Sequence, residues 1–195
     1  MSPLHSIEEA ISHFKSGKFL IVVDDEDREN EGDLVIAAED ITEEQMAFII
    51  RHTGGVVCLP LSDSVADQLG LPHMVDQNTS RFGTAFTVSI EAATGVTTGI
   101  SAADRTVTVK AAIKVDAKPG DLHRPGHVFP LRAKDGGVLV RAGHTEATID
   151  LCKASGKREG GVLSELMHDN GTTMRMPELQ EFSKVHNIPI ISIAE

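Results

Sequence analysis

The stretch Asp24-Asp25-Glu26-Asp27-Arg28-Glu29-Asn30-Glu31-Gly32-Asp33, hereafter the acidic loop, lies between two short apolar runs at residues 19–23 and 34–38. Both runs are rich in β-branched residues and have the length of strands, so the sequence predicts a strand, a loop and a second strand. Seven of the ten loop residues are acidic and only Arg28 is basic. Because like charges repel more strongly where water is excluded, the loop requires a positive partner. We expect a divalent cation with oxygen ligands, assisted by Arg28.

A solvated acidic turn and an EF-hand are the alternatives to a divalent-cation site in the acidic loop. Most runs of charge are solvated surface, but this run lies between two segments that we expect to be buried. The spacing Asp27-x-Glu29-x-Glu31-Gly32 matches the start of an EF-hand calcium loop. The twelfth position is Ala38, where that loop needs a bidentate glutamate, so the EF-hand is excluded.

The composition excludes several classes of protein. Eighteen basic and twenty-nine acidic residues give the 195-residue chain a net charge of −11, which argues against nucleic acid as a partner. A small phosphorylated ligand needs only a local positive pocket and stays compatible with this charge. The sequence has no visible export signal and no apolar run of membrane-spanning length. Cys58 and Cys152 are far apart, as expected for free thiols, so we expect a soluble, cytoplasmic protein with no membrane partner.

Helix and strand patterns alternate along the chain. Ser6-x-x-Glu9 and Thr42-x-x-Gln45 are capping boxes that predict helix starts, and Pro177 suits the first turn of a last helix. Apolar runs at residues 56–61 and 188–193 predict further strands. The sequence has no repeat, linker or low-complexity tract. We therefore expect an α/β (α+β) fold, in which residues 1–195 form a single compact domain with a mixed β-sheet flanked by helices.

The second half of the chain is harder to assign. Residues 101–109 combine a helix-like start with a strand-like alternation, and the pattern does not decide between the two. The irregular segments at residues 71–83 and 116–128 are long enough to be lids over a site. The remaining predictions are a half-buried strand at residues 84–90, a strand at 138–140, a helix from about Thr145 to Gly156 and a helix at 162–168.

The turn Arg141-Ala142-Gly143-His144-Thr145 leads from a predicted strand into a predicted helix. The first N–H groups of a helix favour an anion, and Arg141 and Thr145 add side-chain donors, so this turn is a candidate phosphate cradle. His144 can offer a ring nitrogen to a metal ion, although a lone histidine is commonly a structural hydrogen-bonding group. If His144 meets the acidic loop, one glutamate and one histidine suit Mg²⁺ or Mn²⁺ better than structural zinc.

Three further residues have reactive side chains, but each alone is ordinary. His127 lies in a Pro-Gly-His turn and Glu165 follows a glycine pair, and either can act as a general acid or base. Cys58 lies in an apolar run, so we expect a core thiol, with the alternative that it faces a site. The serine contexts lack a nucleophile elbow, and the glycine pairs form neither a dinucleotide fingerprint nor a P-loop.

Six motifs in order along the chain resemble the 3,4-dihydroxy-2-butanone 4-phosphate synthase family. They are the acidic loop, Arg51-His52-Thr53-Gly54-Gly55, Gly83-Thr84-Ala85-Phe86-Thr87-Val88, Gly99-Ile100-Ser101-Ala102-Ala103-Asp104-Arg105, Pro125-Gly126-His127-Val128-Phe129-Pro130-Leu131 and Arg141-Ala142-Gly143-His144-Thr145-Glu146-Ala147. The likeness covers nearly the whole chain. It implies the fold of that family and one synthase domain, without the GTP cyclohydrolase II domain that is often fused to it.

The resemblance also implies an activity and its site. The implied enzyme is a lyase of riboflavin biosynthesis that converts D-ribulose 5-phosphate to L-3,4-dihydroxybutan-2-one 4-phosphate and formate. It would be a homodimer with active sites near the subunit interface, and would use Mg²⁺ or Mn²⁺, with two divalent ions per site when substrate is bound. Glu29 and His144 match the metal ligands, His127 and Glu165 match the catalytic positions, and Asp33 is our third candidate for proton transfer. The substrate-binding set is Arg28, Glu29, Asp33, Arg141, Ala142, Gly143, His144, Thr145 and Glu165.

The implied reaction agrees with these residue types. It enolises a ketose, removes water, shifts the carbon skeleton and expels C4 as formate, so a divalent ion would stabilise the developing enolates and alkoxides. Two alternative functions are a catalytically silent module that binds metal or sugar phosphate, and an isomerase or aldolase with the same enediol chemistry. Formate release separates them, because neither alternative produces formate.

Overall fold

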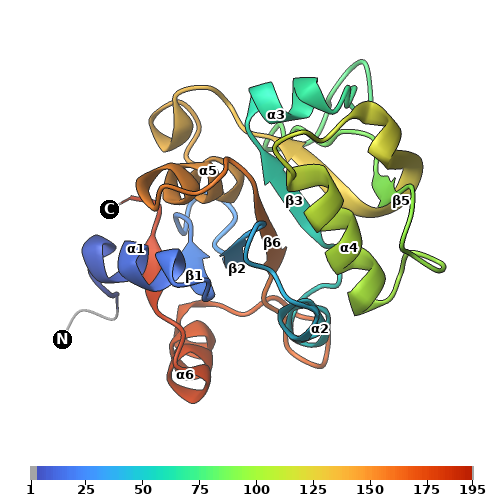
Figure 1. Cartoon of the computed structure of the whole chain (residues 1–195). Helices are drawn as coiled ribbons and strands as arrows, with labels where there is room; N and C mark the ends of the chain where they lie inside the picture. Colours follow the sequence, from blue (N-terminus) through green and yellow to red (C-terminus); the bar gives the residue numbers. More distant parts are fainter. Residues whose placement is uncertain (1–3, 195) are drawn as a thin grey trace.

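A mixed seven-stranded sheet runs through the centre of the molecule, with helices on both of its faces (Figure 1). The computed structural model describes residues 4–194. The strand order is β4-β5-β3-β6-β2-β1-β7, in which β1 pairs with β7 and β3 with β5 in parallel, and the other pairs are antiparallel. The strands are β1 Leu20–Val23, β2 Gly32–Ala37, β3 Cys58–Leu61, β4 Ile90–Ala92, β5 Leu122–Arg132, β6 Gly161–Glu165 and β7 Ile190–Ser192.

Helices cover the sheet in two layers. Helices α1 and α5 pack on one face, and α2, α3, α4 and α6 pack on the other. Within residues 4–194, no helix is both long enough and apolar enough to cross a membrane. The helices are α1 Ile7–Lys15, α2 Glu43–His52, α3 Asp63–Gln68, α4 Ala102–Ile113, α5 His144–Ala154 and α6 Met176–His186, with short 3-10 helices η1 Pro119–Asp121 and η2 Gly137–Leu139.

Alternating side chains of the central strands divide the apolar interior into two cores. Ile21 and Leu34 point into the core under α2 and α4, whereas Leu20 and Val35 point into the core under α1 and α5. A sheet that is buried on both faces has strands that are continuous apolar runs, which explains why residues 19–23 and 34–38 carry no polar alternation. The predicted α/β architecture with a mixed sheet between helices is confirmed.

Side-chain caps fix where several helices begin. Ser6 and Thr42 both form the predicted capping boxes, with Glu9 and Gln45 as their partners. The ambiguous segment at residues 101–109 is helix α4, because the Ser101 hydroxyl accepts a hydrogen bond from the N–H of Asp104. The helix predicted from about Thr145 is α5, one residue earlier.

Two predicted elements have the wrong secondary structure. Residues 138–140 were expected to form a strand, but the chain forms η2, because Gly136 and Gly137 adopt positive φ and Asp150 accepts the N–H of Val138. Residues 162–168 were expected to form a helix, but they begin as strand β6, which lies between β2 and β3. A short apolar run has no period that separates a buried strand from a helix, and here the neighbouring strands decide.

Two further predictions fail at β4 and β5. The half-buried strand expected at residues 84–90 is reduced to isolated bridges at Phe86 and Thr87, and the paired strand begins only at Ile90. The second candidate lid, residues 116–128, is not an irregular loop, since its second half belongs to strand β5. Strand β5 pairs with β4 on both sides of residues 124–127, where the register shifts, and with β3 over residues 129–132.

Replacing Gly126 by alanine should destabilise this part of the sheet. A Cβ atom at this position would lie 2.0 Å from the carbonyl oxygen of Ile90, which is backbone and cannot move aside. We expect the free energy of unfolding, measured by urea denaturation, to fall by roughly 1–3 kcal/mol. Gly120→Ala is the matched control, because a Cβ at residue 120 meets no atom of the described residues within 4 Å. Equal stabilities of the two variants would contradict this packing.

Candidate active site

Three strand ends and one helix start meet on the α5 face of the sheet. The register places Val22 of β1 beside Asp33 of β2, and Asp33 beside Glu165 of β6, so the three residues form a row across the strands. The N-terminus of α5 lies next to this row, since His144 contacts both Val22 and Asp33. A cavity of about 60 Å³ opens here, lined by Arg28, Glu29, Asp33, Cys58, Thr84, Phe86, Leu131, Arg141, His144, Thr145, Leu163 and Glu165.

The buried carboxylate of Asp24 organises the acidic loop. Its Oδ1 accepts the N–H of Glu31 at 3.0 Å, and its Oδ2 accepts the N–H of Glu29 at 3.1 Å and Nη1 of Arg28 at 2.8 Å. Asn30 turns the chain back with φ 53. Asp24 lies close enough to Glu29 and His144 to be a third metal ligand. Because its oxygens are already bonded to the loop's own donors, we assign Asp24 to shaping the loop instead.

Two arginines stabilise the acidic loop, one within it and one from outside. Arg28 Nη1 lies 2.6 Å from Glu29 Oε2, and its guanidinium stands over the ring of Phe82 at 5.2 Å. Arg175, at the start of α6, donates to the backbone carbonyls of Glu29 and Asn30. The side chain of Glu29 therefore extends into the cavity from a backbone that is held by hydrogen bonds at residues 29 and 30.

His144 is oriented by a backbone carbonyl. Its Nε2 lies 3.1 Å from the oxygen of Val22, and because a carbonyl can only accept, Nε2 carries the hydrogen. Nδ1 then faces the carboxylates, 3.5 Å from Glu29 Oε2 and 3.8 Å from Asp33 Oδ2. A carbonyl on one ring nitrogen is the usual support for a histidine whose other nitrogen binds a metal.

The carboxylates and His144 shift one another's pKa. Burial raises the pKa of Asp33 to about 8, and Glu165 and Glu29 raise it further while His144 opposes the shift. Burial alone would lower the pKa of His144, but Asp33 and Glu29 outweigh it and raise the pKa to about 9. The hydrogen bond from His144 lowers the pKa of Glu29. When no metal ion is bound, a proton on the imidazole and the guanidinium of Arg28 offset the negative charge of the site.

The residues present fit a divalent cation. Asp33 Oδ1 is buried and has no hydrogen-bond partner among the described residues, which is costly for an ionisable oxygen. Glu29 Oε2 and His144 Nδ1 are 3.5 Å apart. Two ligands that each lie about 2.1 Å from a Mg²⁺ ion can be up to about 4.2 Å apart, so both atoms can reach one ion. A carboxylate oxygen with an imidazole nitrogen also suits Mg²⁺ or Mn²⁺.

The start of α5 has the form of an anion site. Its N-terminal cap is Gly143, which has no side chain to bond the first N–H groups of the helix. Thr145 is buried at this end, and the Arg141 guanidinium lies over the turn with 19% of its side chain exposed. Helix N–H groups, a hydroxyl and a guanidinium thus converge beside the acidic carboxylates.

The structure brings most of the sequence-predicted site residues together. Seven of them line the cavity, and Ala142 and Gly143 lie in the turn between two of the lining residues. The catalytic and binding roles of all nine residues stay predictions. His127 is not part of the lining; it lies on β5 with its Nδ1 2.8 Å from Glu91 Oε1. Cys58 does line the cavity, and burial raises the pKa of its thiol, which keeps it protonated. The lining residues are Arg28, Glu29, Asp33, Arg141, His144, Thr145 and Glu165.

Sequence reasoning missed the residues that support the site. Asp24 is one of seven acids in the loop, and nothing in the pattern separates it from the others. Arg175 bonds the acidic loop from the start of α6, and no local spacing connects the two. Glu146 lies only five residues after Arg141, but nothing in the pattern shows that the two side chains bond each other.

The chain is similar to known proteins along nearly its whole length. The family model described as 3,4-dihydroxy-2-butanone 4-phosphate synthase matches residues 8–195. A protein of that name from Edwardsiella ictaluri is 57% identical over 194 residues, which cover 100% of this chain and 89% of the relative. A solved 3,4-dihydroxy-2-butanone 4-phosphate synthase in complex with two magnesium ions has a TM-score of 0.94 at 43% identity, and covers 98% of this chain and 94% of that one. The enzyme of Candida albicans has a TM-score of 0.91 at 48% identity, covering 98% and 95%.

Proposed function

This chain belongs to the 3,4-dihydroxy-2-butanone 4-phosphate synthase family, and on that premise we propose how its own residues serve the family's reaction. The chain is a lyase that converts ribulose 5-phosphate to 3,4-dihydroxy-2-butanone 4-phosphate and formate. One observation carries the proposal: the acidic loop, His144, Glu165 and the start of α5 surround a single cavity.

We propose that Glu29 and His144 hold a divalent ion, either Mg²⁺ or Mn²⁺, with a second ion present when substrate is bound. The orientation of His144 supports this, as do the Asp33 oxygen that lacks a partner within residues 4–194 and the similarity to an enzyme that binds two magnesium ions. When bound, such an ion supplies Lewis-acid stabilisation of enolate and alkoxide oxygens. Arg28 and Asp24 keep Glu29 in place toward it.

The turn before α5 is the proposed phosphate cradle. Arg141, Thr145 and the backbone of residues 142–144 would bind the phosphate, while Arg28, Glu29, Asp33, His144 and Glu165 would contact the rest of the sugar. Binding the phosphate away from the reacting carbons positions them without taking part in the chemistry.

The substrate needs more room than the cavity offers in this conformation. Ligand pockets usually measure roughly 300–1,000 Å³, whereas the cavity measures about 60 Å³. A neighbouring hollow of about 600 Å³, formed mainly by residues 73–86, shares Thr84 and Phe86 with it. We propose that residues 71–83 form a lid, because Phe82 stands over Arg28 and its carbonyl accepts Nη2 of Arg141.

Asp33, Glu165 and His127 are the proposed proton carriers. Asp33 and Glu165 are register neighbours on adjacent strands, so one carboxyl can give up a proton while the other takes one. Burial favours the protonated form of Asp33, which suits a group that must hold a proton between steps. His127 would take part in trans, since it does not line the cavity of its own chain.

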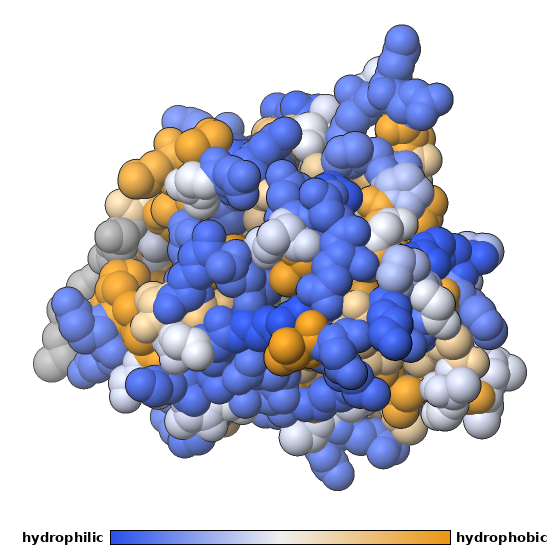
Figure 2. Space-filling view, turned by 45° about the horizontal axis from the view of Figure 1, so that its top comes forward, coloured by the Kyte–Doolittle hydropathy of each residue, from blue (hydrophilic) through white to orange (hydrophobic). Residues whose placement is uncertain are grey.

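We propose a homodimer in which each cavity is completed by His127 of the other subunit. His127 is 44% exposed, and Val56 and Ile100 are exposed apolar residues on the same chain. On the face drawn in Figure 2, apolar side chains form separate patches within a mostly hydrophilic surface. Closed two-fold association would place the same surface of both copies in contact, so each copy would supply one histidine.

Mixing two inactive variants should restore activity if this is correct. Glu29→Gln and His127→Asn should each release almost no formate alone. After the two are co-expressed, half of the dimers are mixed and each mixed dimer has one intact site, so about one quarter of the wild-type rate should return. Formate release and sedimentation velocity are the measurements. A dimer that regains no activity would contradict the shared site, and a monomer with full activity would contradict the dimer.

Two further proposals concern the chain as a whole. We propose that residues 1–195 form one synthase domain, because the two cores lie on opposite faces of a single sheet. We also propose a cytoplasmic location, supported by two buried cysteines that are not joined in a disulfide.

A further inference from the structure

The carboxylate of Glu146 lies next to the proposed phosphate cradle. Glu146, in the first turn of α5, has a side chain that is 1% exposed. Its Oε2 accepts Nη1 of Arg141 at 2.6 Å, and its Oε1 accepts the backbone N–H of Lys134 at 3.0 Å. Both oxygens are therefore bonded to the segment that precedes the helix.

The turn is shaped around this ion pair. A Cβ atom on Gly143 would lie 2.3 Å from Nη1 of Arg141 and 3.0 Å from Oε2 of Glu146. The φ of Gly143 is −120, which any residue can adopt. Glycine is therefore required here because a side chain would not fit, and not because of the backbone conformation. The pair thus packs directly against the backbone that would face the phosphate.

The arginine keeps donors for a ligand. Nη1 bonds Glu146 and Nη2 bonds the carbonyl of Phe82 at 3.2 Å, out of five N–H groups on the guanidinium. A guanidinium that is already held by two hydrogen bonds loses less conformational entropy when it binds a phosphate than a mobile guanidinium does. We propose that Glu146 is a positioning residue that orients Arg141 toward the substrate phosphate; this rests on the proposed phosphate-binding role of Arg141.

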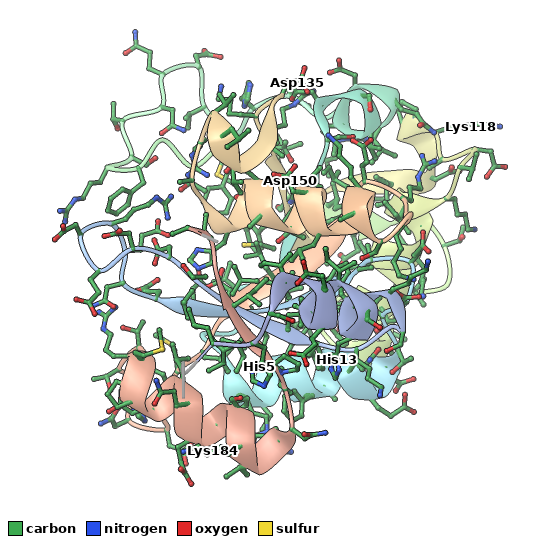
Figure 3. All side chains as sticks on the ribbon, turned by 90° about the vertical axis from the view of Figure 1, so that its left-hand side faces the viewer. His5, His13, Lys118, Asp135, Asp150 and Lys184 are labelled. Carbon is green, nitrogen blue, oxygen red and sulfur yellow. The ribbon has the colours of Figure 1, made fainter. Side chains whose placement is uncertain are left out.

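Asp150 provides a matched control. It lies four residues after Glu146 on the same helix, and its Oδ2 accepts the N–H of Val138 at 2.9 Å. Figure 3 labels Asp150 on α5, on the side that faces the preceding segment. Asp150 therefore anchors the same segment through the same kind of bond, without touching the arginine. A purely structural role of Glu146 predicts that Glu146→Gln and Asp150→Asn behave alike.

The direction in which Glu146→Gln changes phosphate affinity shows whether Glu146 acts by orienting Arg141 or by its charge. Removing a carboxylate near a bound phosphate would by charge alone strengthen phosphate binding. A loss of affinity in Glu146→Gln therefore reports the lost orientation of Arg141. The readouts are KM for ribulose 5-phosphate, kcat, and the inhibition constant of inorganic phosphate as a competitive probe.

We expect Glu146→Gln to raise KM and the phosphate inhibition constant by roughly tenfold each, a size typical of directly bonded side-chain pairs. Its kcat should stay within about threefold of wild type, and Asp150→Asn should change all three quantities by less than about twofold. In an Arg141→Met background, Glu146→Gln should add nothing further. If Glu146→Gln does not fold, Glu146→Asp, which keeps the charge and shortens the side chain, should give the same rise.

Each contrary outcome overturns a specific statement. Tighter phosphate binding in Glu146→Gln, or equal effects of Glu146→Gln and Asp150→Asn, would overturn the positioning role alone. Unchanged KM and inhibition constant in Arg141→Met would overturn the phosphate role of Arg141, and the positioning role with it.

Discussion

Glu29→Gln should lower the rate of formate release by at least roughly 10³-fold, because it removes the charged ligand of the proposed ion. The substitution keeps the shape of the side chain and leaves Asp24 bonded to the loop backbone. The amide that replaces the carboxylate is a weak ligand for a hard divalent cation. His144→Ala should have a similar effect, since it removes the second proposed ligand.

The measurement is formate release from ribulose 5-phosphate, and far-UV circular dichroism tests whether each variant is folded. Wild-type activity should disappear with a chelator and return with excess Mg²⁺. Glu26→Gln is the control, because Glu26 is an exposed acid in the same loop. Its activity should stay within about twofold of wild type. Near wild-type turnover in both Glu29→Gln and His144→Ala would remove these residues from the site.

Asp33→Asn should lower kcat by about 10²–10⁴-fold, the range expected for loss of a general acid or base. The asparagine fills the same space, but its amide cannot take up or release a proton near neutral pH. It also removes a buried carboxylate whose Oδ1 has no partner among the described residues. We therefore expect the midpoint of thermal unfolding to be unchanged or raised, because active-site residues are commonly not optimal for stability.

Ser164→Ala is a suitable companion variant for Asp33→Asn. Ser164 is buried next to Glu165 on β6, but its hydroxyl bonds Thr53 and the carbonyl of Val56, away from the cavity lining. We expect it to lower stability and to leave kcat within about threefold of wild type. A fully active, well-folded Asp33→Asn enzyme would contradict the proton-transfer role of Asp33.

Local chemistry made several elements predictable. The capping boxes at Ser6 and Thr42 bond their own helices, and these bonds do not depend on the rest of the fold. Strands β1 and β2 were predictable because they are adjacent in sequence and joined by the acidic loop. Strand β6 was not, since its neighbours β2 and β3 come from much earlier in the chain and no local period reports them.

In the candidate site, too, contiguous motifs were predictable and contacts between distant residues were not. The acidic loop and the turn at residues 141–145 were recognisable because each is contiguous. Their meeting depends on His144 reaching the carbonyl of Val22, a contact across 122 positions of sequence. Asp24 and Glu146 escaped notice because their role is to bond other side chains and backbone. Only the folded arrangement shows such support.

Anomalous diffraction from crystals soaked in Mn²⁺ would show whether the acidic loop and His144 bind the same ion. We predict an anomalous peak in the cavity, within bonding distance of an oxygen of Glu29 and of Nδ1 of His144, which is lost in Glu29→Gln crystals. A peak that contacts neither residue, or no peak in an enzyme that needs the ion for activity, would contradict a divalent-cation site built from the acidic loop and His144.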